Sequence, residues 1–78
     1  MQRDEVSGST TEDEIRAMKL YGEILKRRRK ERGVTLTELT QRIGINREVI
    51  EGVERGMRDL TPALKKRIKE FLRRQRII

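Results

Sequence analysis

The sequence lacks several residue types on which protein chemistry often depends. Its 78 residues include no cysteine, histidine or tryptophan, and only two aromatic residues, Tyr21 and Phe71. Without cysteine and histidine, disulfides, thiol catalysis and the usual zinc sites are excluded. The six glycines are too dispersed to form a phosphate-binding loop. We therefore expect that the protein is not an enzyme and has no catalytic residue, metal site or cofactor.

Long hydrophobic segments are also missing. No apolar run approaches the ~20 residues that a membrane-spanning helix needs, and the chain shows no signal peptide. We therefore expect a cytoplasmic protein that has no membrane partner.

Charge, in contrast, is abundant and unevenly distributed. The chain carries 20 basic and 13 acidic side chains, for a net charge of +7. Residues 1–15 contain one cation and five acids, a net charge of −4, so the remaining residues carry +11. A basic domain behind an acidic segment favours a polyanionic partner such as nucleic acid. The alternative is a charge-rich surface without any partner, as in thermophile proteins.

Helical periodicity and capping residues predict an all-α fold. We expect a flexible acidic tail at residues 1–10 and a compact four- to five-helix bundle over residues 11–78. A capping box of Thr11 and Glu14 begins the first helix. Gly22 either lies inside this helix, at a cost of about 1 kcal/mol relative to alanine, or separates two helices that meet there.

The centre of the chain has the pattern of a helix-turn-helix. Thr35 and Glu38 form a capping box for a second helix at about residues 36–43. After a glycine, Asn46 caps a third helix at about residues 47–55. Two helices joined by such a short turn cross steeply, which leaves one face of the third helix open. In DNA-binding proteins, that face enters the major groove.

A fourth helix and a small core complete the expected domain. The fourth helix begins at Thr61 and Pro62, because threonine caps helices and proline suits the first helical position. The expected core consists of apolar residues of the helices and of the segments that join them: Tyr21, Leu25, Val34, Leu39, Ile43, Ile45, Ile50, Val53, Leu60, Leu64, Ile68 and Leu72. Ile77 and Ile78 have no evident burial site within one copy of the chain.

Five short motifs in the central part of the chain are informative in combination. They are Gly22-x-x-Leu25-Lys26-x-x-Arg29-x-x-x-Gly33, Glu38-Leu39, Ile43-Gly44-Ile45, Ile50 and Val53-Glu54-Arg55-Gly56. Together they resemble the Xre/Cro family of helix-turn-helix proteins, which includes phage repressors. The resemblance implies a compact helical domain whose third helix contacts DNA bases. It also implies a structural salt bridge between Arg29 of the first helix and Glu54 of the third.

The resemblance further indicates where DNA contacts are expected. In the family, base contacts come from the start and the outward face of the third helix, and the matching residues are Arg47, Glu48, Glu51 and Gly52. As helix N-caps, Thr35 and Asn46 are expected to hold helix N-termini against phosphates. Arg55 and Arg58 follow the third helix and are the expected phosphate clamps.

The sequence departs from the family pattern at positions that matter for binding. Leu36 stands where the family often has a glutamine that touches the phosphate backbone, and leucine cannot form that hydrogen bond. The expected DNA-facing side of the third helix carries two carboxylates, Glu48 and Glu51. A glutamate can accept a hydrogen bond from the cytosine amino group. Alternatively, Glu51 pairs with Arg47 or Arg55, which lie four residues away on the same helix.

These features lead to one main hypothesis and two rivals. The main hypothesis is a sequence-specific transcriptional regulator, a small nucleoid-associated repressor that binds double-stranded DNA as a homodimer. The first rival is a protein-interaction helix-turn-helix module, like those of rod-shape cytoskeletal adaptors, and the acidic third helix favours it. The second rival is an antitoxin, which binds both DNA and a toxin. The basic net charge favours a DNA-binding protein over a purely protein-binding module.

Overall fold

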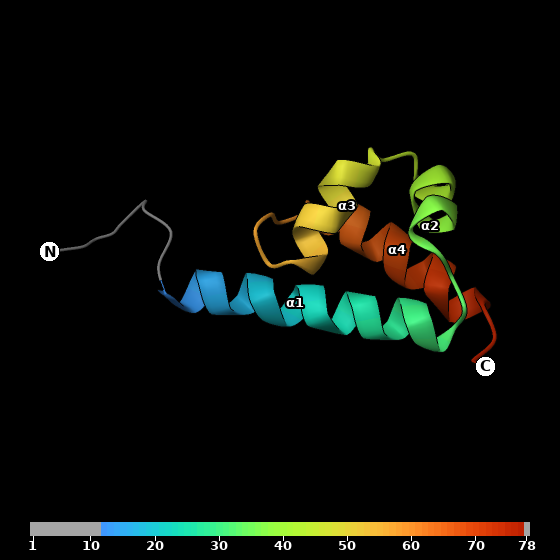
Figure 1. The fold of residues 1–78 in the computed structure, drawn as a ribbon, viewed down its shortest axis with the longest axis horizontal. Helices are drawn as coiled ribbons and strands as arrows, with labels where there is room; N and C mark the ends of the chain where they lie inside the picture. Colours follow the sequence, from blue (N-terminus) through green and yellow to red (C-terminus); the bar gives the residue numbers. More distant parts are fainter. Residues whose placement is uncertain (1–11, 78) are drawn as a thin grey trace, which may run out of the picture.

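The structure, a computed structural model, describes residues 12–77. These residues form four helices and no strand (Figure 1): α1 Glu12–Glu31, α2 Leu36–Ile43, α3 Arg47–Glu54 and α4 Pro62–Arg74. The all-α bundle with a helix-turn-helix, which the sequence predicts, is therefore confirmed. The expected tail at residues 1–10 and Thr11 of the first capping box lie outside the described residues.

Side-chain caps begin α2 and α4 at the residues that the sequence predicts. At α2, Thr35 Oγ1 accepts a hydrogen bond from the Glu38 N–H at 3.1 Å, and Glu38 Oε1 accepts one from the Thr35 N–H at 3.1 Å. At α4, Thr61 Oγ1 accepts a hydrogen bond from the Leu64 N–H at 3.2 Å, and Pro62 occupies the first turn. These caps satisfy backbone donors that a helix start leaves unpaired.

A glycine closes the turn between α2 and α3. Gly44 has a φ of 79°, in the left-handed region that favours glycine, and its N–H donates to the Thr40 carbonyl at 2.8 Å. Ile45 is half-buried against the core within this turn. Asn46 then caps α3, because its Oδ1 accepts a hydrogen bond from the Glu48 N–H at 3.2 Å. The turn is therefore fixed at both ends, and it sets the direction in which α3 leaves α2.

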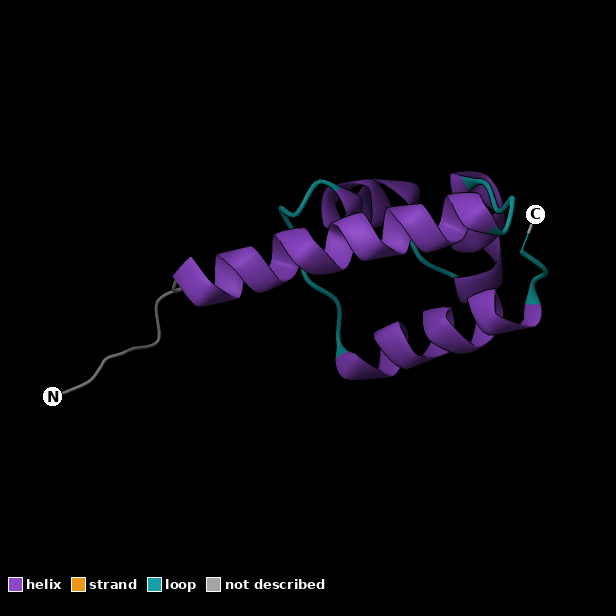
Figure 2. Ribbon diagram, turned by 90° about the horizontal axis from the view of Figure 1, so that it is seen from below, coloured by secondary structure: helices purple, strands orange, loops and turns teal. Residues whose placement is uncertain are grey.

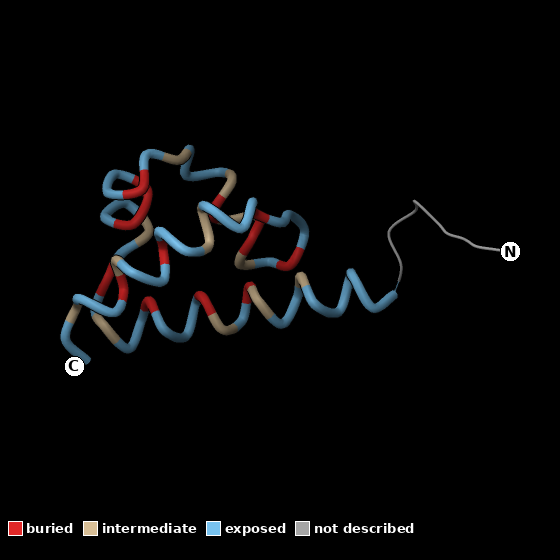
Figure 3. The backbone as a smooth tube through the Cα atoms, turned by 180° about the vertical axis from the view of Figure 1, so that it is seen from behind, coloured by how far each residue is buried: buried red, intermediate tan, exposed pale blue. Residues whose placement is uncertain are grey.

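The core lies on the faces where the helices meet (Figure 3). Nine of the expected core residues are buried: Leu25, Val34, Leu39, Ile43, Ile50, Val53, Leu60, Ile68 and Leu72. Six more apolar side chains are half-buried against them: Tyr21, Leu36, Ile45, Val49, Leu64 and Phe71. Of these six, Leu36, Val49 and Phe71 are additions to the core that the sequence predicts.

The longest helix, α1, supports the helix-turn-helix. α3 packs across α1, and α2 packs against both α3 and α4. The first turns of α1 project beyond the other helices, as the blue end of the ribbon shows (Figure 1). Seen from below, α4 runs alongside α1, and both helices point toward the same end of the molecule (Figure 2). Within residues 12–77, no helix combines the length and the apolar character that crossing a membrane requires.

Gly22 lies where α1 and the end of α3 approach each other closely. α1 is continuous through Gly22, so the alternative of two helices meeting there is wrong. Gly22 is buried, and a Cβ at this position would overlap the Val53 carbonyl oxygen and lie 3.1 Å from the Glu54 carbonyl carbon. The residue therefore weakens α1 as an isolated helix but allows two helix backbones to approach each other.

The variant Gly22→Ala tests this close approach. Helix propensity alone predicts that alanine stabilises α1 by about 1 kcal/mol. Because the added methyl group has no room between α1 and α3, we expect instead that the free energy of unfolding falls by about 1–3 kcal/mol. Urea denaturation followed by circular dichroism measures the change, with Glu23→Ala on the exposed side of α1 as the matched control. A Gly22→Ala protein as stable as this control would contradict the close approach.

One lysine ties the loop between α3 and α4 to α1. Lys65 Nζ lies 2.9 Å from Asp59 Oδ1 and 4.7 Å from the centroid of the Tyr21 ring. The side-chain hydrogen bond from Lys65, together with the backbone hydrogen bond from Leu60, lowers the pKa of Asp59. Burial, and then the charge of Asp59, raises the pKa of Tyr21. The first turn of α4 is thus anchored beside α1 by an ionised carboxylate and a neutral phenol.

Candidate nucleic-acid interface

α3 presents one face to solvent because its apolar residues point into the core. Ile50 and Val53 are fully buried. On the other side of the helix, Arg47 and Glu48 are exposed and Glu51 is half-buried. The helix-turn-helix therefore leaves open the surface at which the sequence predicts base contacts.

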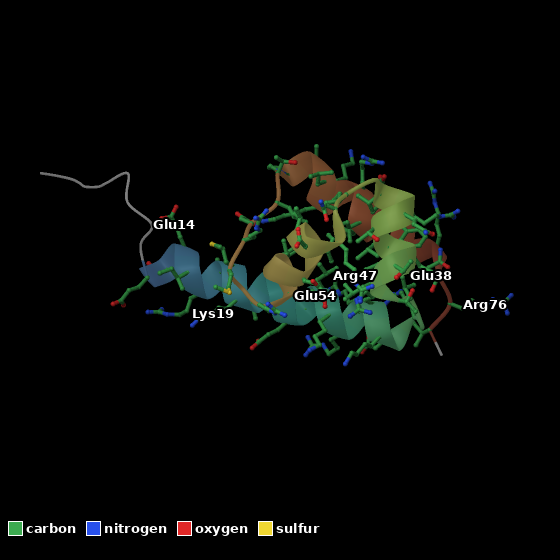
Figure 4. The ribbon with its side chains drawn as sticks, turned by 45° about the horizontal axis from the view of Figure 1, so that its top comes forward. Glu14, Lys19, Glu38, Arg47, Glu54 and Arg76 are labelled. Carbon is green, nitrogen blue, oxygen red and sulfur yellow. The ribbon has the colours of Figure 1, made fainter. Side chains whose placement is uncertain are left out.

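Arg47 lies at the junction of α2 and α3. Its Nε donates to Glu51 Oε2 at 3.4 Å, and its Nη1 donates to Thr37 Oγ1 at 3.4 Å. Figure 4 shows Arg47 between Glu38 of α2 and Glu54 of α3 in that view. Both hydrogen bonds are long, and the Arg47 side chain is 58% exposed. Because exposed ion pairs stabilise little, the guanidinium can exchange them for a phosphate or a base edge.

The two carboxylates of α3 have different surroundings. Glu51 pairs with Arg47 within the helix, which is one of the alternatives to base contact that the sequence left open. Glu48 is exposed in the first turn of α3, where a negative charge interacts favourably with the helix dipole. Glu48 is therefore the more accessible of the two carboxylates.

Gly52 makes room for the side chain of Arg58. A Cβ on Gly52 would lie 3.0 Å from Arg58 Cδ and 3.1 Å from Arg58 Cγ. Gly52 follows Glu48 by one helical turn, so the two lie on the same side of α3. The structure thus brings Arg58, from the loop after α3, onto this side of the helix while the arginine remains exposed.

The N-termini of α2 and α3 differ in the groups that occupy them. At α2, the Glu38 carboxylate accepts a hydrogen bond from the Thr35 N–H at 3.1 Å, and the Thr35 hydroxyl also donates to it at 3.4 Å. A phosphate must displace this carboxylate before it can reach Thr35. At α3, the capping group is the neutral side chain of Asn46. The start of α3 therefore has no carboxylate on its capping hydrogen bonds, although Glu48 lies in the same turn.

Cations flank both ends of the outward face of α3. Arg55 is the C-cap of α3, its N–H donates to the Glu51 carbonyl at 3.1 Å, and its side chain is exposed. Arg55 and Arg58 therefore lie at the end of the helix, whereas Arg47 lies at its start. These guanidinium groups oppose the negative charge of the carboxylates between them.

Arg29 and Glu54, the pair that the family resemblance implies, form a bidentate ion pair between α1 and α3. Arg29 Nε lies 2.8 Å from Glu54 Oε2, and Arg29 Nη2 lies 3.0 Å from Glu54 Oε1. Arg29 Nη1 donates to the Val34 carbonyl at 2.9 Å, so the same guanidinium also holds the segment before α2. The two side chains are only 9% and 7% exposed. The pair fixes the end of α3 against α1.

Comparison with known protein families identifies the family of this chain. A helix-turn-helix family model matches residues 25–75, which include α2, α3, α4 and the later part of α1. The chain belongs to this family. It is the family of Xre-, Cro- and CI-like proteins, and membership makes the chain a DNA-binding helix-turn-helix protein at the family level. No curated protein gives a significant match.

Three features of this helix-turn-helix protein were not predicted from its sequence. Leu36, where the family often has a glutamine, packs half-buried against the core. Thr37 accepts a hydrogen bond from Arg47, and Gly52 lies under the stem of Arg58. The helical spacing of Leu36 from Leu39 and Ile43, three and seven residues later, gave a signal for the first feature. No local signal existed for the other two, because each joins residues of different elements.

The variant Arg29→Met tests the ion pair that holds α3 in this helix-turn-helix protein. It leaves the Glu54 carboxylate buried without its partner, so we expect the free energy of unfolding to fall by about 3–5 kcal/mol. The control is Arg16→Met, which removes exposed pairs with Glu12 and Asp13 and should cost less than about 1 kcal/mol. Urea denaturation compares the two variants, and equal losses would show that the buried pair does not fix α3.

Proposed function

We propose that the chain is a small, sequence-specific DNA-binding transcriptional regulator of the repressor type. The observation that carries the proposal is the open face of α3, with exposed Arg47 at its start and exposed Arg55 and Arg58 after its end. Two further facts support it: the family to which the chain belongs is a DNA-binding family, and residues 16–78 carry a net charge of +11. Catalysis has no part in this function.

In this proposal α3 lies in the major groove. Arg47 exchanges its long hydrogen bond to Glu51 for the O6 and N7 atoms of a guanine or for a phosphate. Glu48 accepts a hydrogen bond from a cytosine amino group. Arg55 and Arg58 bind phosphates beside the groove and fix the register of the helix on the duplex. Glu51, four residues after Arg47 on the same helix, stays near the guanidinium and restricts the positions that the Arg47 side chain can take.

Helix N-termini supply the remaining phosphate contacts. Asn46 caps α3 with a neutral side chain, so the positive end of that helix can face a phosphate directly. Thr35 takes part only when Glu38 moves away from the start of α2. Affinity then comes mostly from Lys and Arg contacts with phosphates and falls steeply as the salt concentration rises.

The proposed mechanism of regulation is steric. A protein bound to an operator excludes RNA polymerase from the same DNA. In this proposal the protein acts in the cytoplasm, at the nucleoid. One domain of this size covers a short stretch of DNA, so we include a homodimer that binds two half-sites related by a two-fold axis. Such half-sites are about 10 base pairs apart.

A protein-interaction module remains the second candidate function. Glu48 and Glu51 on α3, and the Glu38 carboxylate at the start of α2, place three acids on the expected DNA-facing side. Leu36 adds no hydrogen-bonding group there. An adaptor or an antitoxin could use this surface to bind a basic protein instead of DNA.

Selection from a randomised duplex library at near-physiological salt separates these candidates. We expect enrichment of a motif with two-fold symmetry and half-sites about 10 base pairs apart. A single unrepeated motif would support the regulator hypothesis but contradict binding as a homodimer. Absence of any enrichment would contradict the regulator hypothesis and favour the protein-interaction module.

Two arginine variants distinguish base contacts from phosphate contacts. Arg47→Ala should cost about 1–3 kcal/mol at one base pair and relax the preference there. Arg58→Ala should weaken binding to all sequences alike. It should also make the slope of log affinity against log salt concentration less steep, by the amount expected for about one phosphate contact. Fluorescence anisotropy with operator and scrambled duplexes measures both effects, and Arg27→Ala on α1 is the control. If Arg47→Ala and Arg58→Ala lose the same affinity on every duplex, the proposed recognition face is wrong.

The variant Gly52→Ala tests how Arg58 is positioned. The added Cβ would lie 3.0 Å from Arg58 Cδ, so the arginine must shift. We expect a uniform loss of affinity that is smaller than the loss in Arg58→Ala, and no further loss when the two substitutions are combined. A change of sequence preference, with full affinity for non-specific DNA, would instead make Gly52 a base-contacting position.

A further inference from the structure

One side of α1 borders the open face of α3. Arg29 of α1 pairs with Glu54 at the end of α3, so this part of α1 lies directly against α3. On the adjoining side of the helix, α1 carries three lysines at intervals of seven and four residues: Lys19, Lys26 and Lys30. Residues at these intervals lie one above another along a helix. The three side chains therefore form a row, here called the lysine row.

One end of the lysine row lies beside Arg47. A hollow of about 400 Å³ is lined by residues of three helices, among them Lys30 of α1, Thr37 of α2 and Arg47 of α3. Arg47 also donates a hydrogen bond to Thr37 at 3.4 Å across this hollow. Lys30 therefore adjoins the surface at which base contacts are proposed.

The other end of the lysine row lies beside the residues that follow α3. A Cβ on Gly56 would lie 2.9 Å from Lys19 Cα and 2.7 Å from Lys19 Cγ, so the backbone of Gly56 rests on the stem of the lysine. Arg55 immediately precedes Gly56, and the side chains of Arg55 and Lys19 are both exposed. In the view of Figure 4, Glu54 lies between Lys19 and Arg47. The lysine row therefore extends along α3 from one end to the other.

The charges of the lysine row are not neutralised by other side chains. Its three lysines are exposed, and none of them takes part in an ion pair among the residues that the structure describes. One exposed acid, Glu23, lies on the same side of α1 between Lys19 and Lys26, which leaves the row with a net charge of +2. The open face of α3 carries Glu48 and Glu51, and the cations beside it offset their repulsion of a polyanion.

We propose that the lysine row binds DNA phosphates while α3 lies in the major groove. This contact surface rests on the proposed function and adds a second line of backbone contacts to those of Arg55 and Arg58. At 1.5 Å per residue, the row is about 16 Å long. Each strand of a duplex has one phosphate for about every 3.4 Å of its axis, so each lysine can reach a different phosphate. Such contacts fix the position of α3 on the duplex and carry no sequence information.

The groove between α1 and α4 provides a matched control surface. Its volume is about 740 Å³, it has an apolar floor and a basic rim, and it lies where α4 runs alongside α1 (Figure 2). Among the described residues, none of α2 or α3 lines this groove. Its rim includes three exposed cations of α4: Lys66, Lys69 and Arg73. DNA bound to α3 and to the lysine row would not contact these cations.

Two variants that lose the same charge test the contact. The row variant replaces the lysine row with glutamine: Lys19→Gln, Lys26→Gln and Lys30→Gln. Glutamine keeps the Cβ and Cγ atoms that pack on Gly56. The rim variant makes the same change in the groove: Lys66→Gln, Lys69→Gln and Arg73→Gln. Fluorescence anisotropy over a range of salt concentrations gives the slope of log affinity against log salt. The slope should become less steep by roughly 2–3 in the row variant, and by less than about 1 in the rim variant.

Two results of this comparison would overturn the inference. Equal changes of slope in the row and rim variants would mean that the total charge of the protein, and not its contacts, sets the affinity. A wild-type slope in the row variant would mean that the three lysines touch no phosphate. Circular dichroism of both variants checks that each retains its helices.

The acid within the lysine row provides a test in the opposite direction. Glu23→Gln removes a carboxylate that faces the phosphates, so the affinity for every duplex should rise about two- to fivefold, as expected for one exposed charge interaction. The control is Glu70→Gln at an exposed position of α4, which should change the affinity by less than about twofold. A gain of affinity cannot result from unfolding, so this test is independent of the stability of the row variant. Equal affinities of the Glu23→Gln and Glu70→Gln proteins would contradict the inference.

A scrambled duplex separates this inference from the proposed function. Phosphate contacts do not depend on sequence, so both tests are made on the scrambled duplex and on the selected operator. If wild type shows no sequence preference but only the row variant loses phosphate contacts, the lysine row is supported and the regulator hypothesis fails. If wild type is selective and the row variant keeps the wild-type slope, the regulator hypothesis is supported and the lysine row fails. A wild-type protein that binds no duplex even at low salt would overturn both.

Discussion

The buried pair between Arg29 and Glu54 is the interaction on which the rest of this structure depends. α3 has only eight residues, and a helix that short is not stable in water without tertiary contacts. One guanidinium holds the end of α3 through two hydrogen bonds to Glu54 and holds the segment before α2 through the Val34 carbonyl. Two turns earlier on α1, Gly22 lets the α3 backbone approach closely. α3 is therefore fixed at both its backbone and a side chain, and its outward face stays open.

This way of fixing α3 separates two surfaces of a basic molecule. The surface formed by α2 and α3 carries Arg47 and receives Arg58 across Gly52, so it presents cations at both ends of a partly acidic face. The groove between α1 and α4 carries a basic rim over an apolar floor. Both surfaces depend on α1, which supports α3 with its later half and projects with its first turns. A single long helix thus both supports α3 and lines the groove beside α4.

Much of the fold could be predicted because its determinants are local. Thr35 and Asn46 cap α2 and α3, and Gly44 closes the turn between these helices, each through groups at most four residues away. Helical periodicity identified the seven buried apolar side chains that lie within helices, since a stripe on one face of a helix must be buried somewhere. The other two, Val34 and Leu60, lie in the segments just before α2 and α4. The family resemblance supplied the distant pair of Arg29 and Glu54, which no periodicity could have supplied. The order of the helices and the open face of α3 follow from these signals.

The sequence by itself therefore determined where helices begin and end, which residues are buried and which family the chain resembles. Only the tertiary structure decided that Gly22 is a contact between helices and not merely a weak point within one. It also decided that Arg58 lies over Gly52, that Arg47 bonds to Thr37, and that an apolar groove stays open beside α1. The physical reason is that helix caps and apolar stripes depend on neighbours within a turn of helix. Close approaches and grooves depend on how two helices lie against each other, and no short segment of sequence specifies that distance.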